Sequence, residues 1–141
     1  FRSLYIKNKN QYRRKIINDS IFVTALSFSI VIATFLLARP LVLIFLSKTY
    51  AQAIPLLSVL IIGLPFLMLT SVFLNSLYAM QKRLMAVFSF VTLVVINIVA
   101  NIIFIPVYGA MAAAYITIFS EIFNTVFFGG YLWWTLRHEK N

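Results

Sequence analysis

The sequence predicts an all-α protein, a polytopic transmembrane helix bundle of four antiparallel spanning helices. Four apolar stretches fill the chain between Ile21 and Leu136: residues 21–46, 51–80, 84–105 and 108–136. Each exceeds the roughly 20 mainly apolar residues that a helix needs to cross a hydrocarbon core. Hydrophobic residues make up 62% of the 141 residues and charged residues only 11%. A soluble domain of this length could not bury so much apolar surface, so the chain is expected to lie in a membrane.

The basic residues predict the topology of the spans. Six precede the first span, one lies in the first connection, two lie in the second, none lies in the third, and two follow the fourth span. Cytoplasmic loops carry the excess of Lys and Arg, so this alternation places both termini of the segment in the cytoplasm. Membrane topology explains the net charge of +9, and no nucleic-acid partner is expected.

Residues 1–20 precede the first span, and residues 21–141 form the four-helix transmembrane segment. The first five residues resemble the cytoplasmic end of an earlier helix, and a cationic amphipathic lead-in follows. Two interpretations fit the lead-in equally well on pattern alone. It lies against the anionic headgroups of the lipid bilayer, or it is a solvated linker.

Prolines predict bends in the first two spans. Arg39-Pro40 interrupts the first span, because proline lacks an amide donor and disfavours helical angles in the residue before it. A short segment, residues 41–46, should then lean along the outer surface. In the second span, Pro65 leaves the carbonyl of Ile61 without its usual partner. We therefore predict hinges at Pro40 and Pro65.

The connection between the third and fourth spans has its own turn residues. Pro106 is expected to end the third helix, and Gly109 to supply a left-handed turn before the fourth. All of the connections are short, so consecutive helices should be antiparallel neighbours.

Small polar residues recur at helical spacing within the spans and suggest a polar interior. The asparagines among them are Asn75, Asn97, Asn101 and Asn124. A helix that faced lipid on all sides would not need such a stripe. These side chains either form hydrogen bonds between helices, the more frequent case in membrane bundles, or bind a substrate directly.

Two charged side chains lie well inside the apolar stretches. A charge at the bilayer centre costs at least about 2.5–3.5 kcal/mol, so Arg39 and Glu121 invite a functional hypothesis. Arg39 either extends to the headgroups or attracts an anionic group such as a phosphate. Glu121 is a protonated acid in a helix contact, a counter-charge for Arg39, or a cation or proton site for coupled transport.

No enzyme or metal site is expected. The chain has no cysteine, its one histidine is His138 in the polar tail, and it has neither a glycine-rich phosphate loop nor a carboxylate pair suited to acid-base work. We predict no catalytic residue, no metal ligand and no cofactor.

Three passages resemble the polysaccharide-biosynthesis flippases, including the O-antigen flippases, of the multidrug/oligosaccharidyl-lipid/polysaccharide exporter superfamily. They are RPLVLIFLSKTYAQAIPLL, LNSLYAMQKRLMAVFSF and INIVANIIFIPVYGAMAAAYIT. The matching residues are Pro40, Phe45, Tyr50, Ala53, Ala79, Gln81, Lys82, Asn97, Asn101, Pro106, Tyr108, Gly109, Ala113 and Ala114. Ser47 and Ala112 stand where the family has glycine, which weakens the match without disturbing the packing.

The resemblance implies a two-lobe transporter of the bacterial inner membrane, of which this chain would be the last four spans of the second lobe. The complete protein would move an undecaprenyl-pyrophosphate-linked oligosaccharide outward by alternating access for surface polysaccharide such as lipopolysaccharide or capsule. Its partners would be the bilayer, the lipid-linked oligosaccharide and the N-terminal helices of the full-length chain.

Two alternatives stay open at this stage. The first is a drug or cation antiporter of the same superfamily, which would need acidic residues in its cavity. The second is a small four-span membrane subunit that binds partner proteins. A start codon just upstream of Phe1 would favour the subunit, and further spans encoded upstream would remove it.

Overall fold

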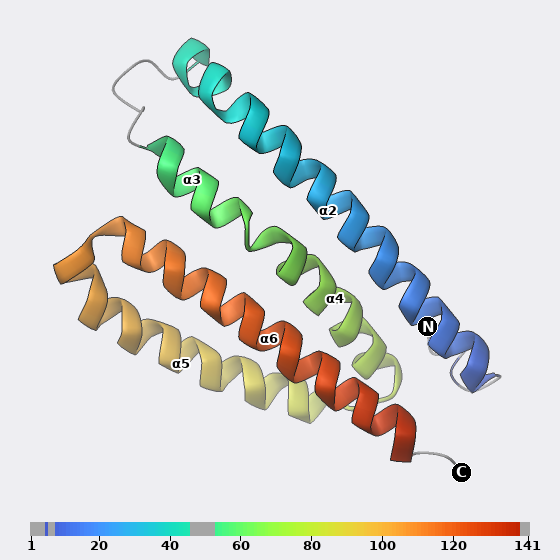
Figure 1. Cartoon of the computed structure of the whole chain (residues 1–141). Coiled ribbons are helices and arrows are strands. Elements are labelled where there is room, and N and C mark those ends of the chain that lie inside the picture. Colours follow the sequence, from blue (N-terminus) through green and yellow to red (C-terminus); the bar gives the residue numbers. More distant parts are fainter. Residues whose placement is uncertain (1–4, 6–7, 46–52, 139–141) are drawn as a thin grey trace.

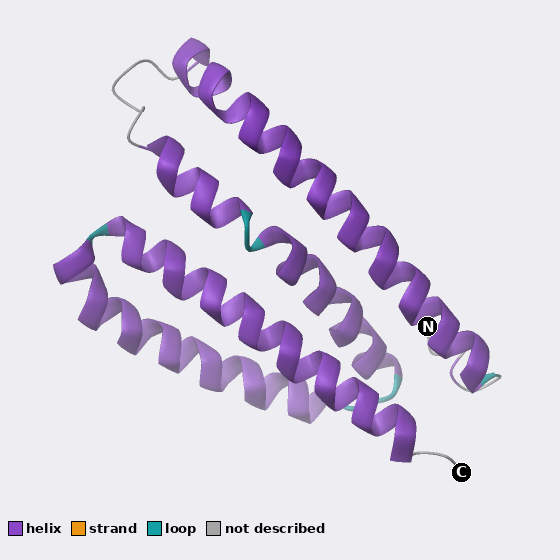
Figure 2. Ribbon diagram, viewed as in Figure 1, coloured by secondary structure: helices purple, strands orange, loops and turns teal. Residues whose placement is uncertain are grey.

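The structure of the protein, a computed structural model, describes residues 5, 8–45 and 53–138. For residues 38, 39, 41–45 and 53 it describes only the backbone. Every regular element within these ranges is a helix (Figure 2). The helices are α2 (Lys9–Phe45), α3 (Ala53–Ile61), α4 (Leu64–Ala79), α5 (Arg83–Tyr108) and α6 (Ala110–His138).

Four helical stretches are long and apolar enough to cross a membrane. They are Lys9–Leu37 within α2, Ile54–Ala79 over α3 and α4 together, Arg83–Tyr108 and Ala110–His138. Most of their large apolar side chains are exposed, as lipid-facing side chains must be. The predicted all-α transmembrane class is therefore confirmed.

The helices lie side by side in the order α2, α3 with α4, α6, α5 (Figure 1). Helix α6 packs extensively against both α4 and α5, whereas α4 and α5 make only a small contact. Consecutive spans do run antiparallel, as predicted, but the main neighbour of α4 is α6, which runs parallel to it. The four spans thus form an open row, and the shared polar interior expected from the asparagines is not formed by these helices alone.

The second span is broken where a hinge was expected. Ile62 and Gly63 donate backbone hydrogen bonds to the carbonyls of Val59 and Leu60, three residues back, so α3 ends in a tight turn. Helix α4 then begins after Gly63, with Pro65 in its first turn, where a missing amide costs nothing. The break therefore lies two residues before Pro65, because proline is better accommodated by restarting a helix than by bending it.

Two other prolines do not end their helices. Helix α2 continues through Pro40 as far as Phe45, so the predicted interruption at Arg39-Pro40 and the separate segment 41–46 are wrong over residues 41–45, and residue 46 is outside the described residues. Helix α5 likewise contains Pro106 and ends at Tyr108. Membrane-spanning helices tolerate proline because neighbouring groups can satisfy the carbonyl that loses its donor. Gly109 has φ +66, so the connection does place glycine at the positive φ that the predicted turn requires.

The cationic lead-in is part of the packed core. Helix α2 already begins at Lys9, and Tyr12 and Ile16 are buried in a cluster with Leu77, Phe128 and others from α4, α5 and α6. The Tyr12 hydroxyl donates a 2.7 Å hydrogen bond to the carbonyl of Ser76. This face of the lead-in therefore packs against protein, and only its other side is left for headgroups or water.

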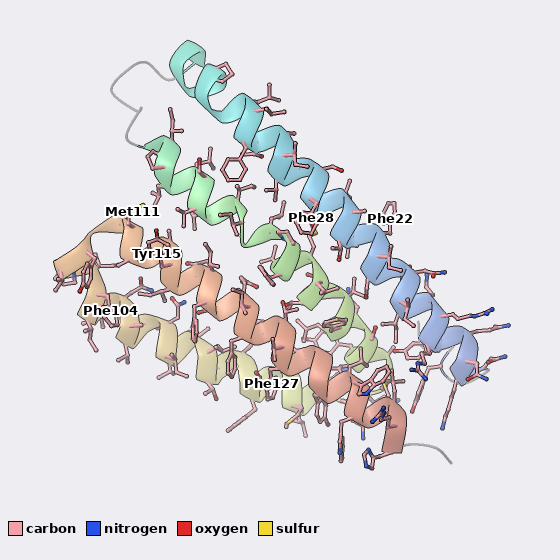
Figure 3. The ribbon with its side chains drawn as sticks, in the orientation of Figure 1. Phe22, Phe28, Phe104, Met111, Tyr115 and Phe127 are labelled. Atoms are coloured by element: carbon pink, nitrogen blue, oxygen red, sulfur yellow. The ribbon has the colours of Figure 1, made fainter. Side chains whose placement is uncertain are left out.

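The basic side chains that the structure describes gather at one end of the row. Helix α2 begins, α6 ends and the turn between α4 and α5 lies at that end (Figure 1). Nitrogen atoms of the described side chains concentrate there (Figure 3). We refer to it as the cation-rich end. The arrangement is the one that the charge alternation requires, and the cytoplasmic placement of this end stays a prediction.

Replacement of Tyr12 by Phe should destabilise the full-length protein by about 0.5–1.5 kcal/mol, because the ring still fills its site but the bond to α4 is lost. Thermal unfolding in detergent measures the change. Tyr115→Phe is the control, since Tyr115 is 60% exposed on α6. Equal melting temperatures for Tyr12→Phe and the unmodified protein would contradict a stabilising role for the hydrogen bond between Tyr12 and Ser76.

Candidate functional site

A polar groove lies between α5 and α6 near the middle of their length. It has a volume of about 240 Å³ and is lined by polar Asn97, Ser120, Glu121 and Asn124 among apolar side chains. Three of these four were predicted from the sequence as site residues. The fold brings them together because α5 and α6 are antiparallel neighbours along their whole length.

A short chain of hydrogen bonds holds the α5 side of the groove. Asn101 donates from Nδ2 to Oδ1 of Asn97 at 2.7 Å and to its carbonyl at 2.8 Å. Asn97 in turn donates from Nδ2 to Oγ of Ser120 on α6 at 3.0 Å. Asn97 and Asn101 are one helical turn apart, which is what allows the first pair of bonds. Of the two roles that the sequence allowed for the asparagines, Asn97 therefore has the first, a hydrogen bond between helices.

Asn124 and Glu121 have side-chain oxygen atoms that no such hydrogen bond satisfies. Asn124 is 6% exposed, and its Oδ1 has no hydrogen-bond partner. Glu121 is half-buried on the same face of α6, one turn earlier, and no described residue forms an ion pair or hydrogen bond with its carboxylate. A buried amide oxygen and a membrane-embedded carboxylate without partners are costly unless a ligand or another helix meets them.

Threonines join the other side of α6 to α4. Oγ1 of Thr125 lies 2.9 Å from Oγ1 of Thr70, 3.0 Å from the carbonyl of Phe66 and 2.9 Å from that of Glu121. Sequence reasoning missed Thr70, Thr125 and Ser120. Thr125 is four residues after Glu121, so helical spacing could have indicated it, but nothing in the sequence identified α4 as its partner.

The remaining predicted site residues are not part of the polar groove. Asn75 is exposed on α4. Pro65 lies at the break between α3 and α4, and Pro40 lies within α2. The side chain of Arg39 is outside the described residues, so its predicted contact with a phosphate or with Glu121 stays a prediction.

A larger apolar groove adjoins the polar one. It occupies about 580 Å³ between the end of α5 and the start of α6, and Phe104, Tyr108, Met111 and Tyr115 are among its lining residues (Figure 3). Ser120 lines both grooves. A polar patch continued by an apolar channel suits a molecule with a polar head and a hydrocarbon tail.

The groups in the polar groove are suited to binding. Amide, hydroxyl and carboxylate oxygens can bind sugar hydroxyls or a cation. Within residues 8–45 and 53–138 no cluster of three or more metal-binding side chains is found.

One protein family matches almost the whole chain. The family model described as Lipid II flippase MurJ matches residues 2–140 of the chain. No curated protein and no solved structure matches it.

Substitutions at Asn97 and Asn124 should differ in their effect on stability. Asn97→Leu removes bonds to Ser120 and Asn101, so the melting temperature of the full-length protein should fall, with a loss of about 0.6–1.7 kcal/mol per contact. Asn124→Leu removes an unpartnered amide oxygen and should leave stability unchanged or higher. A large destabilisation by Asn124→Leu would indicate a structural role for that side chain instead.

Proposed function

Because the chain belongs to the lipid II flippase MurJ family, which is part of the exporter superfamily named above, we propose that the protein moves lipid II across the bacterial inner membrane. Lipid II is the lipid-linked precursor of peptidoglycan. The match over residues 2–140 is the observation that carries this proposal. It supports the prediction of a multi-pass membrane protein that acts as a flippase for a lipid-linked saccharide. It gives no support to the finer prediction of a surface polysaccharide as the substrate.

The polar groove is the part of this chain best suited to the saccharide end of the substrate. Asn124 offers an unpartnered amide oxygen, and Glu121 offers a carboxylate with no described partner. Sugar hydroxyls and amides can donate hydrogen bonds to both groups. The adjoining apolar groove would then accept part of the lipid tail, so that one molecule contacts both regions at Ser120.

Two further roles belong to the proposal. Arg39 would contact the pyrophosphate, because a guanidinium forms paired hydrogen bonds with phosphate oxygens. The break at Gly63, just before Pro65, would let α3 and α4 tilt separately as the transporter alternates between its two open states. No bond is made or broken in this process, so the protein would act as a transporter and not as an enzyme.

The antiporter alternative rests on Glu121 alone. It is the one acidic residue in the described transmembrane stretches beyond the first turns of α2, and a proton or cation site could be built on it. In a flippase the same carboxylate would serve as the coupling group or as the counter-charge for a cation in the cavity. The two functions therefore differ in the transported molecule, although both would use Glu121.

Complementation separates the candidate functions. The full-length gene should restore growth to cells depleted of their own lipid II flippase. It should not restore surface polysaccharide to a strain that lacks an O-antigen flippase. Rescue of surface polysaccharide without rescue of growth would favour the polysaccharide substrate. Dye efflux with neither rescue would favour the antiporter.

Glu121→Gln should lower transport about tenfold, the range expected when one coupling contact is lost, while the amount of protein in the membrane stays the same. Gln keeps the size of the side chain and removes its charge. Asp19→Asn is the matched control, since Asp19 forms an exposed ion pair with Lys15 at 3.3 Å and such pairs contribute little. Equal transport by Glu121→Gln and the unmodified protein would exclude Glu121 from coupling.

A further inference from the structure

Two arginines from opposite ends of the chain meet at one tryptophan at the cation-rich end. The guanidinium carbon of Arg13, near the start of α2, lies 4.6 Å from the centroid of a Trp133 ring. That of Arg137, in the last turn of α6, lies 5.0 Å from a Trp133 ring. Each contact is a favourable cation–π interaction, but it also brings two like charges to the same side chain. Such an arrangement favours an anion between or beside the two guanidinium groups.

An apolar groove begins at the same place. It has a volume of about 250 Å³ and runs between α2 and α6, with Arg13 and Trp133 among its lining residues and Phe73 of α4 beside them. Its walls are formed mainly by Ile16, Ile17, Ile21, Leu132 and Leu136. Ile17 is 47% exposed and Ile21 64% exposed, so the groove is open toward the surrounding bilayer.

Gly129 lines this groove, and its lack of a side chain lets Phe73 pack close to α6. A Cβ at that position would lie 2.9 Å from the ring of Phe73, closer than carbon atoms normally approach. Phe73 therefore packs directly on the backbone of α6. A larger residue at position 129 would have to displace the Phe73 ring.

One polar side chain in the groove has no partner. The hydroxyl oxygen of Ser20 is buried and makes no hydrogen bond. Other helical serines of this chain, such as Ser71 and Ser76, donate to the carbonyl four residues back. The Ser20 hydroxyl is thus left for a group that enters the groove.

We propose that this groove binds one anionic phospholipid of the bilayer. The phosphate lies against Arg13 and Arg137, one acyl chain lies along Ile17 and Ile21 of α2, and Ser20 donates to an ester carbonyl of the lipid. Guanidinium groups pair well with phosphate oxygens, and each cation near an anionic membrane surface adds to the attraction. The lipid would add to the side-chain contacts that hold the start of α2 near the end of α6.

The lining of the groove argues for a membrane phospholipid over the lipid-linked saccharide. A large saccharide needs several hydrogen-bonding groups, and the polar side-chain groups that line this groove are one serine hydroxyl, one guanidinium and the indole N–H of Trp133. The groove also shares no lining residue with the polar groove between α5 and α6. The phospholipid site is therefore separate from the proposed transport site and does not depend on it.

Native mass spectrometry of the full-length protein tests the proposal. Delipidated protein is mixed with phosphatidylglycerol or with phosphatidylcholine of the same acyl chains. We expect the unmodified protein to retain one more phosphatidylglycerol than phosphatidylcholine. The double variant Arg13→Gln/Arg137→Gln should bind that molecule at least about tenfold more weakly, given the loss of two cations near the phosphate. Arg14→Gln is the matched control and should bind normally, because Arg14 is exposed and does not line the groove.

A second variant keeps the test decisive if the double variant does not fold. Ile17→Trp leaves both arginines in place and fills the groove, so it should also lose the extra phosphatidylglycerol. Retention of that lipid by both variants would overturn the proposal, and so would equal retention of the two phospholipids by the unmodified protein. Displacement of the bound phosphatidylglycerol by undecaprenyl pyrophosphate would also overturn it, because the groove would then belong to the lipid-linked substrate.

Discussion

Hydrocarbon lipid offers no hydrogen-bond partner to a polar group, and most features of this protein follow from that constraint. Every regular element in the described residues is a helix, because a helix satisfies its own backbone. Several hydroxyl side chains are satisfied within their own helix in the same way. Ser58, Ser71, Thr92 and Thr117 each donate to the carbonyl four residues earlier and so can lie in an apolar span at little cost.

The constraint also makes the exceptions informative. The break at Gly63 frees backbone groups inside the second span, and tight-turn hydrogen bonds satisfy part of them. The side-chain amide of Asn97 on α5 donates a hydrogen bond to Ser120 on α6. Asn124, Glu121 and Ser20 have polar side-chain atoms without a described partner, and each lines a groove. In lipid these are the positions where another molecule or another helix is expected.

Helix α6 connects these features. It packs against α4 and α5 and contributes Ser120, Glu121 and Asn124 to the polar groove. Near its C-terminal end, Trp133 contacts a basic side chain of α2 and another of α6. The buried cluster around Tyr12 and Phe128 lies at the cation-rich end, where four helices meet. The opposite end has no comparable cluster among the described residues. The packing therefore fixes the row at one end, and the outer ends of the helices depend more on the lipid around them.

The sequence by itself determined that the protein is an all-α membrane protein, because span length and apolar composition depend on the bilayer and not on the neighbours of a helix. It also determined that consecutive spans are antiparallel, because the connections between them are short. It also identified Asn97, Glu121 and Asn124, since a polar side chain in a long apolar span is conspicuous without any structure. It was less reliable for prolines: Pro40 and Pro106 lie within helices, and the break near Pro65 is at Gly63.

Only the tertiary structure decided which helices are neighbours. Short connections predicted that α5 would lie beside α4, yet α6 lies between them, because side-chain contacts such as Thr70 with Thr125 and the burial of Phe128 depend on the faces of helices far apart in sequence. The same packing placed Tyr12 of the cationic lead-in in the core, whereas the sequence had suggested only headgroups or water as neighbours of the lead-in. It also brought Arg13 and Arg137 to one tryptophan. Periodicity along one helix cannot reveal such contacts, because it fixes the face on which a residue lies but not what that face meets.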